Sequence, residues 1–232
     1  TEIYTLSLHD ALPIPYSGDL SGPLGWQLGY PYLQKQLYEF YGDKRIIEDN
    51  YEALKKQINF LDSQAYRGLF YWDISDHEAI DPKPESFSAN AFYYHHLKIA
   101  AEFAGILNKQ EDSTRYGKRI ATLKRNIQRQ YHVPGTGRFD NATQSAQLFA
   151  LWYDLSPESD KSFDFLLQEL ERHRWHISTG IFSTAFFFDI MRQKNRNDIA
   201  YRVANQRDYP GWGFMLDSGY MEIGRASCRE RV

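Results

Sequence analysis

Residues 68–107 read GLFYWDISDHEAIDPKPESFSANAFYYHHLKIAAEFAGIL, and this stretch decides the fold. Its first part predicts a loop, because carboxylates crowd together there and two prolines then forbid a helix. The carboxylates belong to Asp73, Asp76, Glu78 and Asp81. From Ser88 to Leu107 the apolar side chains recur every three or four residues. That spacing predicts a buried helix, with Ser86 or Ser88 as its N-cap.

The loop in this stretch is a candidate binding loop. An acidic, aromatic loop that leads directly into a buried helix is typical of a scaffold that presents polar groups to a ligand. Trp72 and His77 within the acidic run favour this interpretation. The alternative is a solvated surface loop, and both interpretations stay open on these residues alone.

Composition excludes several classes of protein. A net charge of −3 with mixed signs along the chain gives no basic surface for nucleic acid. No apolar run is long enough to predict a membrane span. Aromatic residues make up 16 %, including 17 Tyr and 5 Trp. Tyr and Trp combine an apolar face with a polar handle, which suits both packing between long helices and gripping sugar rings.

The two ends of the chain are expected to lie outside the domain. Residues 1–14, TEIYTLSLHDALPI, and residues 222–232, EIGRASCRERV, resemble the two translated ends of a sequencing adapter. A signal-like leader is the alternative for the first, but it lacks a positively charged start. We therefore expect the domain to occupy residues 15–221, which contain no cysteine because Cys228 lies in the tail. Disulfides and thiolate sites are then excluded.

Apolar spacing along the domain predicts consecutive helical hairpins. Gly42 should end the first helix and Asp43 should cap the second, while Ser156 should cap the sixth with Pro157 at its first position. No stretch alternates convincingly with period two, so the predicted class is all-α. The paired ranges are 30–41 with 43–61, 88–107 with 116–131, 141–152 with 160–172, and 181–192 with 197–205.

Long loops rich in glycine, proline and aromatic residues are expected between the hairpins, whereas the turns within hairpins are short. These loops span residues 16–29, 66–87, 132–141, 173–180 and 206–220. If the hairpins pack side by side, the long loops gather at one end. They would then form a pocket lined by Trp26, Trp72, His77, Trp175 and Trp212.

Four phrases in series resemble a known family. They are residues 31–61, residues 76–107, ISTGIFST at 177–184 and DYPGWGFML at 208–216, and they are similar to the catalytic domain of bacterial α-L-rhamnosidases, glycoside hydrolase family 78. The resemblance implies a partial (α/α)₆ toroid holding about four of six antiparallel hairpins. It also implies hydrolysis of terminal α-L-rhamnosides with inversion, by one glutamate that protonates the leaving oxygen and another that activates water.

Both implied catalytic glutamates are expected to be missing. The family's acid lies in an Asp-Cys-Pro phrase that is absent here, and its base would fall near position 225, just beyond Glu222. The resemblance therefore implies an inactive fragment in which the apolar faces of 30–41 and 181–190 lack neighbours. A non-catalytic carbohydrate-binding toroid and another six-hairpin inverting glycosidase remain as alternatives.

The resemblance also implies substrate-binding residues. Asp76 matches the aspartate of a Gly-Asp-Trp phrase, where it would accept hydrogen bonds from sugar hydroxyls, and His77 replaces the tryptophan. Trp26 matches a family tryptophan, but Gln27 and Leu28 after it are a second departure from the family pattern. The full set of candidate substrate-binding residues is Trp72, Asp76, His77, Glu78, Gln144, Thr179 and Trp212.

The same resemblance implies a rhamnoside as substrate and no cofactor. It also implies a periplasmic or extracellular location rather than a cytoplasmic one. His173 and His176 flank Trp175 with a spacing that suits a metal, but no thiol or third histidine accompanies them, so no metal site is expected. His95 and His96 lie on a helical face and are expected to be interior residues. Oligomeric state is not addressed by the sequence.

Overall fold

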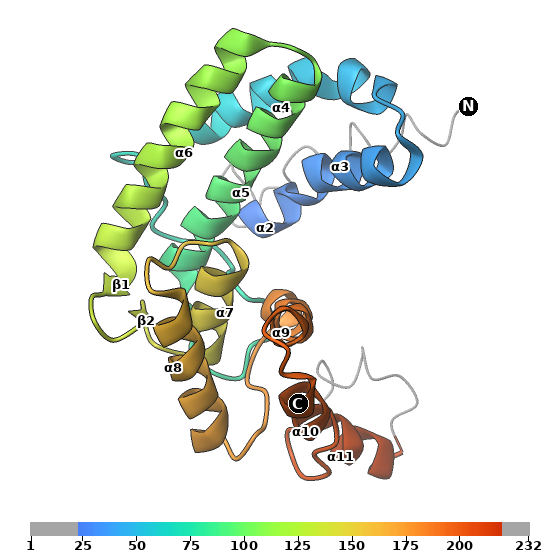
Figure 1. The fold of residues 1–232 in the computed structure, drawn as a ribbon, viewed down its shortest axis with the longest axis vertical. Coiled ribbons are helices and arrows are strands. Elements are labelled where there is room, and N and C mark those ends of the chain that lie inside the picture. The colour runs from blue at the N-terminus through green and yellow to red at the C-terminus, as the bar shows by residue number, and fades with distance from the viewer. Residues whose placement is uncertain (1–22, 220–232) are drawn as a thin grey trace. The chain divides into compact units, whose positions relative to one another are not determined.

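The structure is a computed structural model, and it describes residues 23–219 (Figure 1). Expectations for residues 1–14 and 222–232, including those for Glu222 and Cys228, lie outside the described residues. The elements are α2 (Leu24–Gln27), α3 (Gly29–Tyr41), α4 (Arg45–Gln64), α5 (Glu85–Ile106), α6 (Gln110–Tyr131), β1 (His132–Val133), β2 (Arg138–Phe139), α7 (Gln144–Trp152), α8 (Ser159–Arg172), α9 (Ile181–Gln193), α10 (Asn197–Ala204) and α11 (Trp212–Asp217).

The described chain divides into two compact units. Unit 1 contains residues 23–75 and 88–129, and unit 2 contains residues 76–87 and 130–219. Within residues 23–219, none of the helices combines the length and the apolar character needed to span a lipid bilayer.

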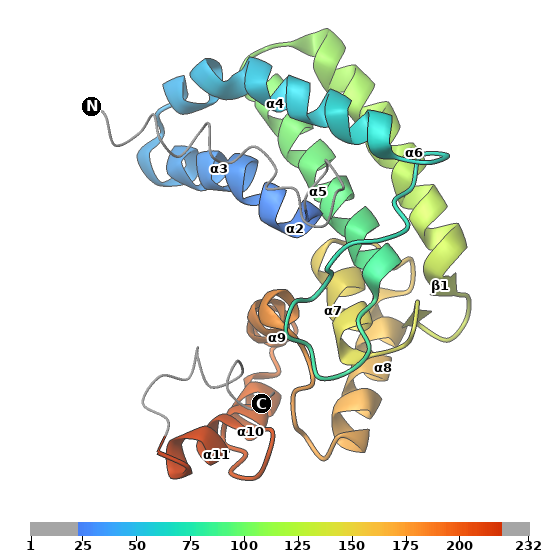
Figure 2. The ribbon, with the colours of Figure 1, turned by 180° about the vertical axis from the view of Figure 1, so that it is seen from behind.

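In unit 1, the short helix α2 is followed by the hairpin of α3 and α4 (Figure 2). Gly42 ends α3 in the left-handed conformation with φ 67°, as its position after the last apolar residue predicts. The expected Asp43 cap of α4 is wrong: the helix begins at Arg45 with Lys44 as its N-cap, and Asp43 Oδ1 instead accepts from the Arg45 main-chain nitrogen at 3.0 Å in the preceding turn. The apolar face of α4 is buried: Ile47, Tyr51, Leu54, Ile58 and Leu61.

The tyrosine, leucine and phenylalanine side chains of α3 are exposed or half-buried. Phe40 is 83 % exposed and Tyr41 is 76 % exposed, whereas the polar side chain of Gln34 is buried. On α9 the outcome is mixed, since Ile181 is exposed but Ile190 is buried. Large exposed apolar faces mark surfaces that associate or aggregate.

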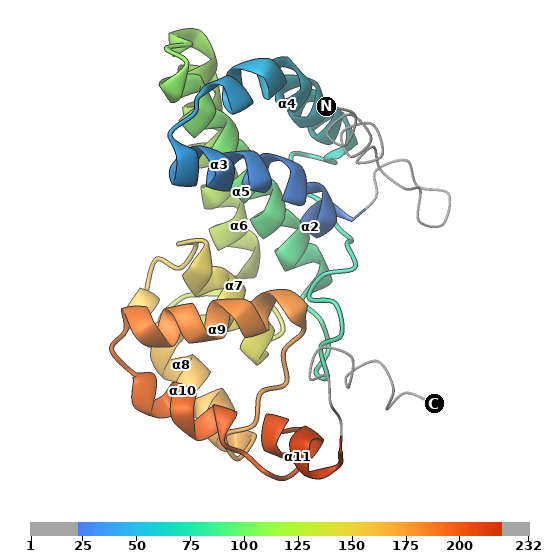
Figure 3. The ribbon, with the colours of Figure 1, turned by 90° about the vertical axis from the view of Figure 1, so that its right-hand side faces the viewer.

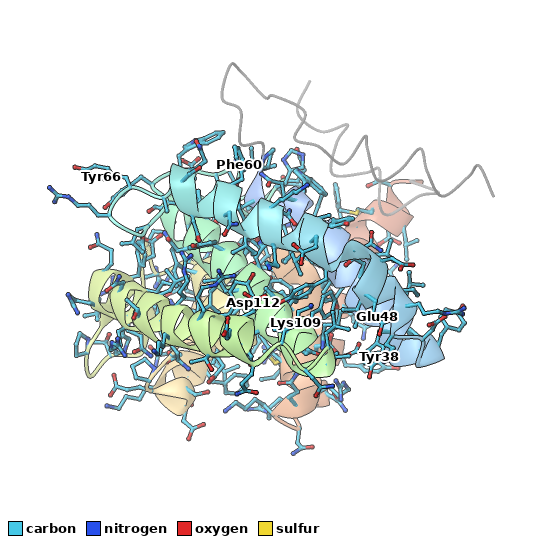
Figure 4. All side chains as sticks on the ribbon, turned by 90° about the horizontal axis from the view of Figure 1, so that it is seen from above. Tyr38, Glu48, Phe60, Tyr66, Lys109 and Asp112 are labelled. Atoms are coloured by element: carbon cyan, nitrogen blue, oxygen red, sulfur yellow. The ribbon has the colours of Figure 1, made fainter. Side chains whose placement is uncertain are left out.

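A polar cluster joins α4 to the start of α6. The Tyr51 hydroxyl donates to Asp112 Oδ2 at 2.9 Å, and Lys55 and Arg115 lie 3.3 and 2.8 Å from the same carboxylate. Figure 4 shows Asp112 beside Lys109 at this end of α6. Burial raises the pKa of Tyr51, and the hydrogen bond to the Asp112 carboxylate raises it further. The neutral hydroxyl is therefore a suitable donor to the charged group.

Unit 2 contains the hairpins α7–α8 and α9–α10, with α7 packed against both α8 and α9 (Figure 3). Its core is aromatic and aliphatic: Phe139, Leu148, Phe149, Leu166, Leu170 and Phe187 are buried. The antiparallel pair β1–β2 precedes α7, with His132 opposite Phe139. These strands could not be predicted from the sequence, because two residues are too few to show an alternating pattern.

Several predicted helix starts are wrong. Helix α5 begins at Glu85, so Ser86 and Ser88 lie inside it and neither is its N-cap. The Ser86 hydroxyl pairs with that of Tyr131, and the Ser88 hydroxyl donates to that of Ser75. Ser156 does not cap α8: its hydroxyl accepts from the Glu158 nitrogen in a turn, and the helix begins at Ser159. Helix α7 begins at Gln144, where the Thr143 hydroxyl caps it.

Two short helices lie inside predicted loops. Helix α2 carries Trp26 within the expected loop 16–29, and α11 begins at Trp212 within the expected loop 206–220. Both are only one or two turns long, and such segments carry too few residues for a periodic apolar signal.

Candidate functional site

The buried carboxylate of Asp76 joins three segments of unit 2. Oδ2 accepts from the Ser145 hydroxyl at 2.6 Å and from the Gly180 nitrogen at 2.7 Å. Oδ1 accepts from the nitrogens of Phe182 and Ser183 at 3.0 and 3.1 Å. These last two nitrogens belong to the first turn of α9, where N–H groups have no partner within the helix. Asp76 therefore caps α9 and stabilises it with a negative charge at its N-terminus.

Main-chain hydrogen bonds hold the turn of residues 76–81 against residues 178–181. The Ile181 nitrogen donates to the His77 carbonyl at 2.8 Å, and the Ile80 nitrogen donates to the Ser178 carbonyl at 3.0 Å. Gly180 lies at the closest approach, where a Cβ would be 2.2 Å from the His77 carbonyl oxygen. Only glycine fits at this position, and this close contact explains why glycine follows Thr179 in the sequence.

His77 and Glu78 are carried on this fixed turn. Their side chains are 44 % and 19 % exposed, and His77 Nε2 lies 3.4 Å from Glu78 Oε1. Glu78 has φ 64°, a left-handed conformation that is uncommon outside glycine and that the surrounding hydrogen bonds must hold. The turn thus presents an imidazole and a carboxylate together, a combination that can donate and accept hydrogen bonds at a polar ligand.

Gln144 and Thr179 lie in the same frame. The Gln144 amide donates to the His176 carbonyl at 3.0 Å and accepts from the Ser178 nitrogen at 3.1 Å, which fixes residues 176–178 against α7. The Thr179 hydroxyl pairs with that of Thr184 at 2.7 Å. Both residues are buried, as Asp76 is. The observed contacts of all three are structural, and direct contact with a sugar stays a prediction.

Trp212 is the first residue of α11 and is partly exposed. Its ring lies 5.5 Å from that of Phe188 on α9. The turn that precedes it is tight, since a Cβ on Gly211 would be 2.4 Å from the Gln206 carbonyl oxygen. Trp212 is therefore held by a compact glycine turn and by one aromatic neighbour.

Trp72 belongs to unit 1, where its side chain is 51 % exposed. The adjacent Asp73 is buried, and its Oδ1 accepts from the Leu24 nitrogen at 3.2 Å. Burial raises the pKa of Asp73 to about 6. The predicted pocket combines Trp26 and Trp72 of unit 1 with residues of unit 2, so their gathering around one pocket stays a prediction.

Several residues that build the site carry no signal in the sequence. Ser145 and Ser178 contribute hydroxyls to Asp76 and Asp81, and His176 bonds Asp208 at 2.8 Å. Serines inside ordinary helices and loops carry no sequence signal of such a role. Within residues 23–219, no group of three or more His, Cys, Asp and Glu side chains is placed to hold a metal ion.

Burial lowers the pKa of both histidines of α5, which lie in unit 1. His96 is fully buried, and burial lowers its pKa to about 4. The pKa of His95 is lowered to about 3, first by burial and then by the charge of neighbours including His96. His96 is therefore an interior residue, as expected, whereas His95 is half-buried.

Consecutive helical hairpins place the described part of the chain among all-α proteins built from antiparallel helix pairs. The chain belongs to the bacterial α-L-rhamnosidase six-hairpin glycosidase family, whose model matches residues 7–223. This confirms the resemblance seen in the sequence.

Individual relatives agree with the family match. The chain is 28 % identical over 213 residues to an α-L-rhamnosidase of Streptomyces avermitilis, covering 88 % of this chain and 20 % of the relative. It is 26 % identical over 211 residues to an α-L-rhamnosidase of Alteromonas sp., covering 84 % of this chain and 23 % of that relative. The chain thus spans about a fifth of the length of these relatives.

Solved structures confirm the all-α six-hairpin fold class. The Streptomyces avermitilis α-L-rhamnosidase complexed with L-rhamnose matches with a TM-score of 0.77 and 27 % identity, over 84 % of this chain and 19 % of that one. The α-L-rhamnosidase of Dictyoglumus thermophilum matches with a TM-score of 0.79 and 25 % identity, over 88 % of this chain and 24 % of that one.

Proposed function

We propose that this chain is part of an inverting glycosidase that removes terminal α-L-rhamnosyl groups from glycosides or polysaccharides. The observation that carries the proposal is the family match across residues 7–223. The solved relative complexed with L-rhamnose supports this choice of sugar. An inverting mechanism needs two carboxyl groups about 6.5–9.5 Å apart, one to protonate the leaving oxygen and one to activate water.

The chain by itself is proposed to be inactive. The acidic Cys-Pro phrase that carries the family's acid does not occur in the sequence. The position of the base falls near residue 225, where the sequence has arginine. Without an acid and a base on opposite faces of the sugar, neither protonation nor water activation is supplied.

The residues of the candidate site are proposed to take two kinds of role. Asp76, Gln144 and Thr179 are positioning residues, because their polar atoms bond other parts of unit 2. His77 and Glu78, on the turn that they fix, are the groups proposed to bond sugar hydroxyls; a charge-assisted bond to Glu78 would be the stronger. Trp72 and Trp212 are proposed to stack on apolar faces of the sugar.

Hydrolysis of 4-nitrophenyl α-L-rhamnoside tests the proposal, with the α-D-mannoside as control. We expect no release of nitrophenol by this chain and release by the complete gene product that contains it, with inversion visible in the NMR spectrum of the freed sugar. Hydrolysis of the mannoside alone would instead support a six-hairpin glycosidase of different preference.

A non-catalytic carbohydrate-binding domain is a second candidate, favoured by His77 at the position where the family has a tryptophan. Binding of L-rhamnose by a complete gene product that does not hydrolyse any rhamnoside would select it. His77→Trp tests the role of this position in either candidate: it should tighten rhamnose binding if the ring of this residue stacks on the sugar.

A further inference from the structure

Residues 66–71 form a tight hairpin that follows α4 in unit 1. The Leu69 nitrogen donates to the Tyr66 carbonyl at 3.1 Å, and the same two residues form an antiparallel bridge. Between them, Arg67 and Gly68 have φ angles of 52° and 78°. Left-handed angles at both central positions are typical of a type I′ turn, which matches the twist of a hairpin. The tip of the hairpin is therefore a defined turn.

A buried amide of α5 fixes the base of this hairpin. The Phe70 nitrogen donates to Asn90 Oδ1 at 3.0 Å, and Asn90 Nδ2 donates to the Phe70 carbonyl at 2.7 Å. Both main-chain polar groups of Phe70 are thus bonded, as they would be by a neighbouring strand. The Phe70 ring is buried, with its centroid 5.2 Å from that of Tyr93. Phe70 therefore anchors the hairpin to α5, and the residues around it are carried on a fixed backbone.

Two exposed tyrosine rings lie beside each other on the hairpin. Tyr66 is 62 % exposed and Tyr71 is 55 % exposed, with ring centroids 6.0 Å apart and planes inclined at 58°. The Arg67 guanidinium lies over the Tyr66 ring, 5.2 Å from its centroid. Figure 4 shows Tyr66 on the loop after α4, directed away from the helices. Tyr66, Arg67 and Tyr71 together form what we call the aromatic corner.

The polar groups of the aromatic corner are available to a ligand. Within residues 23–219, no acidic side chain pairs with Arg67, and no hydrogen bond joins the hydroxyl of Tyr66 or Tyr71 to another group. Arginine presents five N–H donors in a planar fork, and it pairs most strongly with a carboxylate through two parallel bonds. A ligand that fits the corner therefore combines an apolar face for the rings, hydroxyls for the phenols and a carboxylate for the guanidinium.

The size of the corner favours a sugar over a protein partner. A tyrosine buries about 150–250 Å² when it is fully covered, so the exposed parts of the two rings offer roughly 300 Å² at most. A stable protein interface takes about 800 Å² from each partner. One or two sugar rings need far less. A uronic acid unit has the apolar face, the hydroxyls and the carboxylate in a single ring.

We propose that Tyr66, Arg67 and Tyr71 form a binding site for a carboxylate-bearing sugar unit of a polysaccharide. Stacking on the two rings supplies affinity, and Arg67 supplies the preference for an acidic unit. The choice of a polysaccharide as the source of this unit rests on the function proposed above. The site itself does not, because it is built from contacts within unit 1.

Affinity electrophoresis of this chain tests the proposal, in gels that contain a polymer of alternating L-rhamnose and D-galacturonic acid. The polymer should slow the migration of the chain, relative to a gel without polymer. Tyr66→Ala and Tyr71→Ala should each weaken the binding about tenfold, because each removes one stacking face. Tyr201→Ala is the matched control: Tyr201 is 75 % exposed on α10, and its replacement should leave the binding unchanged.

Arg67→Gln separates recognition of the carboxylate from stacking. The same polymer after methyl esterification of its carboxyl groups should bind the parent about tenfold more weakly than the acid form, because the charge-assisted bonds are lost. Arg67→Gln should bind both forms equally, at the level of the esterified polymer and the parent. Circular dichroism should show no change of fold in any of these variants, since all the replaced side chains are exposed.

The same variants in the complete gene product give a second measurement that does not depend on the behaviour of the isolated chain. Equal binding of the two polymer forms by the parent would overturn the proposal, as would retention that survives both tyrosine substitutions. Reduced self-association of the tyrosine variants with unchanged polymer binding would identify a protein interface instead. Hydrolysis of the nitrophenyl rhamnoside is measured separately, so a failure of that reaction and a failure of this site are distinguishable.

Discussion

The carboxylate of Asp76 accepts a hydrogen bond from the main-chain nitrogen of Ser183 at 3.1 Å, across 107 residues of sequence. One buried side chain thus ties the turn that carries His77 and Glu78 to the start of α9. Each oxygen of the carboxylate accepts two hydrogen bonds, so replacement should affect the whole of unit 2 rather than a single loop.

Asp76→Ala should lower the free energy of unfolding by about 3 kcal/mol, because it removes a helix cap and leaves buried N–H groups without an acceptor. Urea denaturation followed by circular dichroism measures this. The control is Asp164→Asn at an exposed position of α8, which should change stability by less than about 0.5 kcal/mol. Equal effects of the two substitutions would contradict the capping role.

Gly180→Ala should destabilise the protein by about 2 kcal/mol or more, since its Cβ would lie 2.2 Å from the His77 carbonyl oxygen and the backbone must shift. Gly117→Ala is the matched control. Gly117 lies in α6 with nothing within 4 Å of an added Cβ, so alanine there should stabilise by about 0.5–1 kcal/mol. The two thermal midpoints should move in opposite directions; a shared direction would argue against the close contact at Gly180.

Asp73→Asn should change the pH dependence of stability. Burial raises the pKa of Asp73 from 3.8 to about 6, so the folded state holds a proton that the unfolded state releases. The contribution of this group to the free energy of unfolding therefore falls as pH rises from about 4 to 6 and stays low above that. Asparagine keeps an oxygen for the Leu24 nitrogen without the charge.

The variant should accordingly be more stable than the parent at pH 7, by about 2–3 kcal/mol, and the difference should vanish near pH 4. Denaturation at several pH values measures both quantities. A constant difference across that range would show that the carboxyl titrates alike in the folded and unfolded states.

Phe40→Ser should reduce self-association with little loss of stability, because the ring is 83 % exposed on α3. Light scattering after gel filtration measures the association. Ile47→Ser, at a fully buried position of the neighbouring helix, is the contrasting variant and should cost about 3 kcal/mol or more. If association were unchanged by Phe40→Ser, the exposed face of α3 would not be its cause.

The long helices could be predicted from the sequence because their apolar positions repeat. All five apolar positions assigned to residues 43–61 are buried on α4. The strands β1 and β2 and the short helices α2 and α11 could not, since a few residues show no period. Helix starts depend on individual side-chain bonds, which is why Ser88 and Ser156 were misassigned as caps.

The candidate site was predictable in part. The phrases around Asp76 and Thr179 indicate that these residues matter. The sequence does not show, however, that the Asp76 carboxylate bonds the Gly180 nitrogen, or that the Thr179 hydroxyl pairs with that of Thr184. Partners separated by 104 and 107 residues leave no local pattern. His176 was considered only for its spacing from His173, whereas its observed partner, Asp208, lies in a different loop.

The long separation between Asp76 and α9 also sets an order of events during synthesis. Translation proceeds at about 5–20 residues per second, so Asp76 emerges from the ribosome several seconds before the helix that it caps. During that interval the carboxylate is hydrated, and the turn around it has no second half on which to fold. Unit 2 of the nascent chain must therefore remain open until the Gly180 region has been made.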